Sequence, residues 1–205
     1  RDISERRRYE RDLNRQIDRL ERVAQVLSHD LRNPLNVAEG NVDLARETGD
    51  LDRLEAVEAA HGRMRGIIEE ALTMVRSGSG VEAVDPVDVG EFAADCWANV
   101  ATGDATLSTV DPGLVYADED RLAHLFENIY RNAVEHGGES VTVRVGVEEG
   151  RFFVEDDGPG IPEADRESVF ELGWTTEDDG SGLGLNIVAD IAATHDWTTT
   201  VGESA

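Results

Sequence analysis

The first 80 residues repeat apolar positions at the spacing of an amphipathic helix. From about residue 9 to 35, apolar side chains recur every three or four positions, at Leu13, Ile17, Leu20, Ala24, Leu27 and Leu31. The pattern continues through Val37, Val42 and Leu44, and Thr48-Gly49-Asp50 predicts a turn. A second helix is predicted over about 51–76, with inward-facing positions at Leu54, Val57, Met64, Ile67, Ile68, Leu72 and Val75.

A two-helix hairpin cannot bury such a stripe alone, so we expect two chains to pair as a four-helix bundle. Ser77-Gly78-Ser79-Gly80 should form a flexible linker after it. A plain dimerising coiled coil would explain the leucines, but not His29, Asp30 and Pro34 together. Pro34 removes a backbone hydrogen bond and should bend the first helix just past His29.

Beyond the linker the pattern changes to short alternating runs. Strands are predicted at about 84–88, 106–109, 114–116, 141–147, 152–156 and 198–201, and helices at about 89–98, 118–136 and 183–195. Mixed short strands and three helices indicate an α+β sandwich. The chain therefore divides into three parts. Residues 1–8 are a short N-terminal segment, residues 9–80 form a helical hairpin, and residues 81–205 form an α/β sandwich domain.

The octapeptide Ser28-His29-Asp30-Leu31-Arg32-Asn33-Pro34-Leu35 carries the first candidate chemistry. Neutral imidazole is a good nucleophile near pH 7. Asp30 can hydrogen-bond the second ring nitrogen of His29, fix the tautomer and take up the proton as the first nitrogen attacks. A lone histidine on a helix is more often a packed or solvated side chain, so further motifs are needed.

Four further pieces occur in a fixed order. They are Asn128-Ile129-Tyr130-Arg131-Asn132, with two amides on one helix face, then Asp156-Asp157-Gly158-Pro159-Gly160-Ile161-Pro162 after a strand, Phe170-Glu171-Leu172-Gly173-Trp174-Thr175-Thr176 in a loop, and Gly180-Ser181-Gly182-Leu183-Gly184-Leu185 before a helix. Each piece is ordinary alone. The ordered set indicates a nucleotide site.

The octapeptide resembles the phospho-acceptor box of sensor histidine kinases. The four pieces resemble the N box, first glycine box, F box and second glycine box of their catalytic domain, which shares a superfamily with gyrase B and the mismatch-repair ATPases. The resemblance covers nearly the whole chain. It implies that the γ-phosphoryl of ATP moves to His29 and then to an aspartate of a response regulator receiver domain. It also implies that Asn33 serves in removing phosphate from that regulator.

The resemblance assigns roles within the nucleotide site. Asn132 would hold Mg²⁺ against the phosphates with support from Asn128, and Asp156 would accept a hydrogen bond from the adenine amine. Gly158 and Gly160 would let the backbone pass close to the base.

The second glycine box would offer backbone amides to phosphate at a helix N-terminus. Its residues in this role are Gly180, Gly182, Leu183 and Gly184. Residues 161–181 would form a mobile lid that Phe170 anchors.

Two departures from the family pattern concern phosphate contacts. Glu135 and Glu177 stand where the family often has lysine, so arginine, backbone amides or bound cations must take that role. The family also usually has one more glycine turn and strand after Val201. A gyrase-type ATPase is disfavoured because such enzymes use a glutamate at position 128, and Asn128 cannot act as a base. A degenerate kinase serving as a dimeric scaffold or ATP sensor is the other alternative.

Composition and charge indicate which partners are excluded and which salt conditions suit the protein. The net charge is −25, from 44 acidic residues against 19 basic ones, all of them arginine. Such a chain should not bind nucleic acid through a basic face. Disorder would suit so acidic a chain, but 40% hydrophobic residues with clear periodicity argue against it. The lysine-free, acid-rich composition resembles haloarchaeal proteins, in which molar salt shortens the screening length to roughly 3 Å.

The single cysteine, Cys96, excludes an internal disulfide and favours a reducing compartment, so we expect a cytoplasmic location. No apolar run is long enough to span a bilayer, and no membrane contact is expected from this segment. The first residues, Arg1-Asp2-Ile3-Ser4-Glu5-Arg6, resemble the end of a PAS sensory domain. An upstream sensory domain, and any membrane segment, would then lie outside this chain.

The charge predicts that the dimer depends on salt. Pairing doubles the net charge, and at low ionic strength the repulsion reaches over roughly 10 Å or more. Exposed arginine–carboxylate pairs offset only about 0–1 kcal/mol each. Dilution from molar to tenth-molar potassium chloride should lower the melting temperature and dissociate the dimer before ATP binding is lost. Light scattering that finds an unchanged dimer across this range would contradict the halophilic interpretation.

Overall fold

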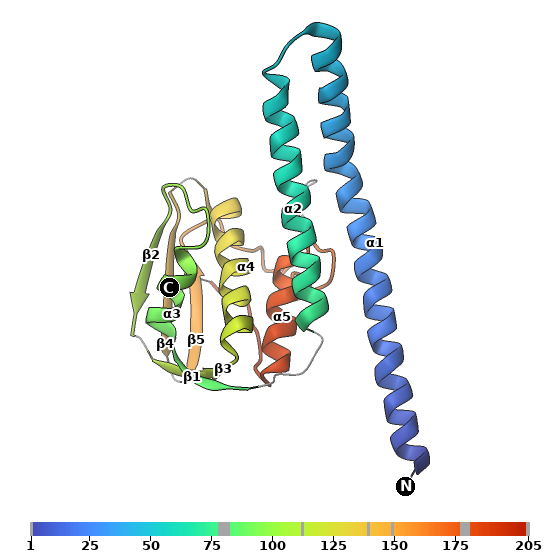
Figure 1. The fold of residues 1–205 in the computed structure, drawn as a ribbon. Helices are drawn as coiled ribbons and strands as arrows, with labels where there is room; N and C mark the ends of the chain where they lie inside the picture. Colours follow the sequence, from blue (N-terminus) through green and yellow to red (C-terminus); the bar gives the residue numbers. More distant parts are fainter. Residues whose placement is uncertain are drawn as a thin grey trace. The chain divides into compact units, whose positions relative to one another are not determined.

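The computed structural model describes residues 2–77, 83–111, 113–138, 140–148, 150–176 and 181–203 (Figure 1). The chain forms two compact units. One comprises residues 1–78 and 175–181, and the other comprises residues 79–174 and 182–205. Each unit is described by itself below.

The first unit is built on a helical hairpin of α1 (Asp2–Thr48) and α2 (Arg53–Ser77). α1 continues through Pro34, as predicted, and residues 2–8 also belong to it. The predicted turn is confirmed. Gly49 takes φ +73°, its N–H donates to the carbonyl of Ala45, and the Asp50 side chain accepts from the N–H of Asp52. Neither helix, within the described residues, carries an apolar stretch that could cross a bilayer.

Small side chains form the seam of the hairpin. Ala38, Val57 and Ala60 are buried together, with Val42 packed against them. Several larger apolar side chains of the same hairpin stay exposed, namely Ile17, Leu20, Leu35, Val37, Leu44, Leu51, Leu54, Ile68 and Leu72. Three of the positions predicted to face inward, Leu54, Ile68 and Leu72, are thus not covered in the single hairpin. Ile67 and Met74 of α2 are buried, so only part of the predicted apolar stripe is left uncovered.

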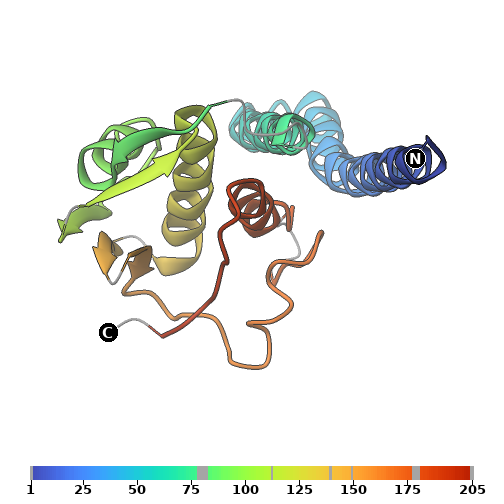
Figure 2. The ribbon, with the colours of Figure 1, turned by 90° about the horizontal axis from the view of Figure 1, so that it is seen from below.

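The second unit is an α+β domain, as predicted. Its elements are β1 (Asp85–Asp88), α3 (Val89–Trp97), β2 (Thr106–Val110), β3 (Leu114–Ala117), α4 (Glu119–Gly137), β4 (Thr142–Glu148), β5 (Arg151–Asp156) and α5 (Gly184–Thr194). β1 and β3 pair antiparallel. In the sheet β2-β4-β5, β2 runs parallel to β4 and β5 antiparallel to it. Figures 1 and 2 show α4 between the strands and α5.

One predicted strand is wrong. The structure has no strand over residues 198–201, although three consecutive threonines and a valine, all β-branched, suit one. A strand requires a neighbour that completes its hydrogen-bond ladder, and β5 has only β4 beside it in the three-stranded sheet. The β-branched residues of this segment therefore predicted a strand for which the sheet provides no pairing partner.

Aspartates begin two of the helices. Asp88 accepts from the N–H groups of Gly90 and Glu91 at the start of α3. Asp118 accepts from the N–H of Arg121 at the start of α4. Such caps satisfy backbone donors that a helix leaves unpaired. They explain why both helices begin where the sequence predicted.

Aromatic rings centre the core of the second unit on α4. Phe126 and Tyr130 stack with centroids 5.6 Å apart, and Trp97 of α3 meets Tyr130 edge-on at 4.9 Å. The Tyr130 hydroxyl donates to the carbonyl of Ala93, 3.1 Å away. Burial raises the pKa of Tyr130. These contacts hold α4 rigidly against α3 and the strands.

The same core predicts an unreactive thiol. Cys96 is buried, and burial, followed by the charges of Glu127 and Asp95, raises the pKa of its thiol to about 11. Only the thiolate alkylates, so iodoacetamide at about pH 8 should label the native chain far more slowly than the chain unfolded in guanidinium. Mass spectrometry of timed samples measures the two rates. Equal rates would contradict the burial of Cys96.

Candidate active site

The phospho-acceptor candidate has the geometry of a nucleophile with its base. On α1, His29 Nδ1 lies 2.9 Å from Asp30 Oδ1. A carboxylate accepts, so Nδ1 carries the proton and the lone pair is left on Nε2. The His29 side chain is 85% exposed, whereas that of Asp30 is 16% exposed. Nε2 is therefore the ring nitrogen that a substrate can reach.

Asp30 retains capacity to accept a proton. Its Oδ2 is buried and has no hydrogen-bond partner among the described residues. A carboxylate oxygen that no donor occupies keeps its lone pairs available for a proton. Asn33 is exposed one turn further along the same helix, and Pro34 beside it is buried. The structure thus places all three predicted residues on one helix, with Asp30 in direct contact with His29.

Two amides of α4 lie against the start of α5. The side chain of Asn128 is 6% exposed, and its Nδ2 donates to the carbonyl of His124, 2.7 Å away. Its Oδ1 is buried without a partner in the described part of the chain. A Cβ at Gly184 would lie 3.2 Å from Asn132 Oδ1 and 3.6 Å from Asn128 Oδ1. The predicted residues Asn128, Asn132 and Gly184 therefore meet in space.

The start of α5 suits an anion. Its N-cap residue, Leu183, provides no side-chain cap, so backbone N–H groups of the first turn are left for another partner. Because the Leu183 side chain is fully buried, this residue can contact an anion only through its backbone. Gly182 takes φ +61° before the helix. Gly180, predicted to belong to the same loop, lies outside the described residues.

These groups fit Mg²⁺ held with the phosphates of a nucleotide. Amide and phosphate oxygens are the hard ligands that Mg²⁺ takes, and few of them need to come from protein. The orphaned Oδ1 of Asn128 and the adjacent Oδ1 of Asn132 supply such oxygens. No group of three or more His, Cys, Asp and Glu side chains within the described ranges could hold a metal alone.

The end of β5 brings the predicted adenine residues to the C-terminus of α4. Asp156 Oδ1 accepts from the N–H of Gly158 at 2.9 Å. A Cβ at Gly158 would lie 2.7 Å from that oxygen and 2.8 Å from the Cα of Gly137. Only a glycine permits this approach. Gly160 takes φ +69°, which redirects the chain into the next segment.

Asp157 holds the same turn to β4. Its Oδ1 accepts from the N–H of Thr142 at 2.7 Å, and its own N–H donates to the carbonyl of Thr142. The first of these bonds lowers the pKa of the Asp157 carboxyl. Sequence reasoning missed Asp157 and Gly137, because their partners are distant in the chain.

The segment between the glycine boxes is closed at its base. The N–H of Gly173 donates to the carbonyl of Gly182 at 3.0 Å, and a Cβ at Gly182 would clash with the Gly173 carbonyl carbon. Asn186 Nδ2 donates to the carbonyl of Phe170 at 2.8 Å. Phe170 is only partly buried, whereas Val169 is 1% exposed. The segment is therefore anchored by Val169 and by the main chain of Phe170.

Asn186 and Gly173 were also missed by sequence reasoning. Gly173 lies in the F-box piece, and Asn186 directly follows the last glycine box. A search for polar side chains on the helix that follows the loop could have found Asn186. Of the two glutamates at expected lysine positions, Glu135 is exposed on α4 and Glu177 lies outside the described residues.

Two models of known protein families match this chain. Residues 19–80 match the His Kinase A (phospho-acceptor) domain. Residues 117–205 match the histidine kinase-, DNA gyrase B-, and HSP90-like ATPase family. The first match contains His29, and the second contains both amides, Asp156 and the glycine boxes. The chain therefore carries a phospho-acceptor-type hairpin followed by an ATPase-type domain, in the order of these two matches.

The chain is similar to sensor kinases of two bacteria. This chain is 27% identical to the sensor histidine kinase YkoH of Bacillus subtilis and 28% identical to the sensor histidine kinase CpxA of Escherichia coli. Both alignments cover 89% of this chain and 44% of the relative, so the chain spans less than half the length of these proteins.

A solved structure shares the fold of the kinase core. It is the histidine kinase ThkA, crystallised in complex with the response regulator protein TrrA. The TM-score is 0.67 and the identity 20%, and the match covers 91% of this chain and 58% of ThkA.

The close approach of Gly158 to Gly137 yields a prediction for the kinase core. Gly158→Ala adds a methyl group that meets Gly137 and Asp156, so it should destabilise the second unit by about 1–3 kcal/mol and weaken nucleotide binding. Thermal melts and calorimetry with ATP measure both effects. Gly202→Ala is the matched control, because a Cβ there meets nothing within 4 Å. Wild-type behaviour of both variants would contradict the proposed adenine site.

Proposed function

We propose that this chain is the catalytic core of a sensor histidine kinase of a two-component system. It transfers the γ-phosphoryl group of ATP to His29 and then to an aspartate of a response regulator receiver domain. The observation that carries the proposal is the exposed His29 ring whose Nδ1 bonds to Asp30, in a chain that also holds the Asn128–Asn132–Gly184 cluster.

His29 acts as the nucleophile through Nε2. The bond from Nε2 to the γ-phosphorus forms while the bond from that phosphorus to its bridging oxygen breaks, and ADP leaves. Asp30 holds the Nδ1 proton and accepts it as the ring gains positive charge, which leaves a neutral phosphohistidine. The unpartnered Oδ2 of Asp30 supports this role.

The second unit binds and orients the nucleotide. Asp156 receives the adenine amine, and backbone N–H groups from Gly182 to the first turn of α5 contact phosphate. Asn132, with Asn128 behind it, would hold Mg²⁺, which neutralises charge on the phosphates when bound. The tight backbone contact between Gly158 and Gly137 supports an adenine site, because it keeps side chains out of this region.

Competing functions are less well supported. A gyrase-type ATPase requires a base that activates water, and the amide at position 128 instead donates to the carbonyl of His124. A catalytically silent scaffold would not need the contact between His29 and Asp30. The kinase therefore remains the function that uses the most of the observed geometry.

The partners of the kinase are proposed on similar grounds. The uncovered apolar residues of α1 and α2 support a homodimer through a four-helix bundle, because a second hairpin would bury them. ThkA, which shares this fold, was crystallised with a response regulator protein, and that complex supports a receiver domain as the partner here. Asn33, exposed one turn past His29, would act in dephosphorylation of the regulator.

The setting of the kinase is part of the same proposal. The net charge of −25 without lysine supports a haloarchaeal type. Residues 1–8 would continue an upstream PAS-like sensory domain into α1, and the kinase core would work in the cytoplasm.

Radiolabel from γ-labelled ATP tests the phosphotransfer. In high-salt buffer the wild-type chain should gain acid-labile label, and His29→Gln should gain none while it binds ATP normally. Asp30→Asn should slow labelling by roughly 10²–10⁴. His61→Gln, which replaces another exposed histidine of the hairpin, is the matched control and should label normally. Label that persists in His29→Gln would refute the assignment.

A further inference from the structure

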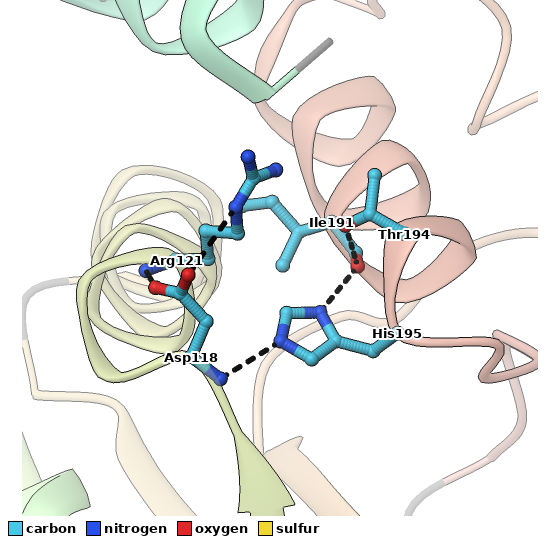
Figure 3. Close-up of polar contacts among 5 residues, drawn as sticks. All are labelled: Asp118, Arg121, Ile191, Thr194 and His195. Carbon is cyan, nitrogen blue, oxygen red and sulfur yellow. Dashed lines mark hydrogen bonds and ion pairs between the residues drawn. The ribbon is translucent and has the colours of Figure 1, made fainter. Parts of the chain in front are cut away.

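His195 joins the ends of α4 and α5 that lie away from the nucleotide residues. It follows the last residue of α5, and its Nε2 accepts a hydrogen bond from the backbone N–H of Asp118, at 3.0 Å (Figure 3). Its Nδ1 lies 2.8 Å from the carbonyl oxygen of Ile191. The ring therefore connects the C-terminal end of α5 to the N-cap of α4.

The two partners determine the protonation state of the ring. The carbonyl of Ile191 can only accept, so Nδ1 must carry a proton. The N–H of Asp118 can only donate, so Nε2 must present its lone pair. The neutral Nδ1–H tautomer alone makes both bonds. A doubly protonated ring would face the N–H of Asp118 with a second donor and would lose that bond.

When the His195 ring is protonated, the neighbouring groups do not replace the hydrogen bond that it loses. The carboxylate of Asp118 already accepts from the N–H of Arg121 and lies 3.7 Å from Arg121 Nε (Figure 3). Asp196 is the next charged residue along the chain after His195. On the remaining side the ring stacks on Trp197 at 4.5 Å, and Trp197 in turn packs on Phe152 of β5.

The helix pair links this junction to the candidate nucleotide site. α4 and α5 run antiparallel, because Asp118 meets His195 at one end while Asn132 meets Gly184 at the other. Asp118 lies 14 residues before Asn132, which is about 21 Å of helix. A shift of one helix along the other at the His195 end therefore moves Gly184 relative to the amides.

We propose that His195 is a proton-sensitive positioning residue of the nucleotide site, and that its neutral form keeps the start of α5 against Asn128 and Asn132. This inference rests on the proposed nucleotide function of that cluster. Protonation of the ring releases the Asp118 bond and weakens nucleotide binding. The bond from the Asp118 N–H disfavours protonation of His195, so a proton binds His195 better when that bond is broken. Nucleotide affinity therefore falls as pH falls.

The test compares nucleotide affinity of the full chain at about pH 8 and about pH 5.5 in high salt, with a fluorescent ATP analogue as the probe. The wild-type affinity should fall about three- to tenfold more than that of His195→Gln, whose amide oxygen accepts from Asp118 at both pH values. His195→Ala should bind more weakly than wild type at pH 8. Protonation of the nucleotide affects every variant alike, so the ratio between variants is the readout.

His124→Gln is the matched control, because it removes a partly exposed imidazole from α4 and should keep the wild-type pH profile. The wild-type chain supplies a second measurement that needs no variant. By NMR, the amide proton of Asp118 and the imidazole of His195 should titrate with the same midpoint as the affinity. A pH profile in His195→Gln equal to that of wild type, or an Asp118 amide that does not titrate, would overturn the inference. Absence of nucleotide binding in wild type at both pH values would instead overturn the proposed function.

Discussion

The packing of α4 against α5 is the contact on which the nucleotide site depends. At one end Gly184 lies against Asn128 and Asn132, where even a methyl group would meet an amide oxygen at 3.2 Å. At the other end His195 bonds to the backbone of Asp118. Direct contacts therefore join the two helices at both ends. The site is therefore a property of a helix pair, and the glycine boxes serve it by keeping side chains out.

The two units place different demands on their sequences. The chemistry at His29 needs only one helix, because its base is the next residue and the contact is made within a single turn. The nucleotide site needs α4, the end of β5 and the start of α5 to meet, which requires the aromatic core around Tyr130 to hold α4 in place. The chain thus joins a locally encoded candidate nucleophile to a candidate nucleotide site that exists only in the folded domain. The apolar side chains that the single hairpin leaves exposed are the basis of the proposed pairing with a second copy.

Predictions from sequence succeeded where local patterns dominate. The two long helices, the turn at Gly49 and the starts of α3 and α4 follow from periodicity and capping, both of which act within a few residues. The strand expected at 198–201 failed because a strand depends on a partner that the local pattern does not contain. The inward orientation of Leu54, Ile68 and Leu72 likewise depends on a neighbour outside the single hairpin.

By itself, the sequence determined the order of elements, the candidate nucleophile with its carboxylate, and the set of amides, aspartates and glycines that predict a nucleotide site. It did so because helix periodicity, side-chain chemistry and motif order are properties of adjacent residues. Only the tertiary structure decided that Gly158 touches Gly137, that Asn186 holds the main chain of Phe170, and that Val169 is the buried anchor beside it. These contacts join residues separated by many positions, and their geometry follows from how the sheet and helices pack, which no local pattern records.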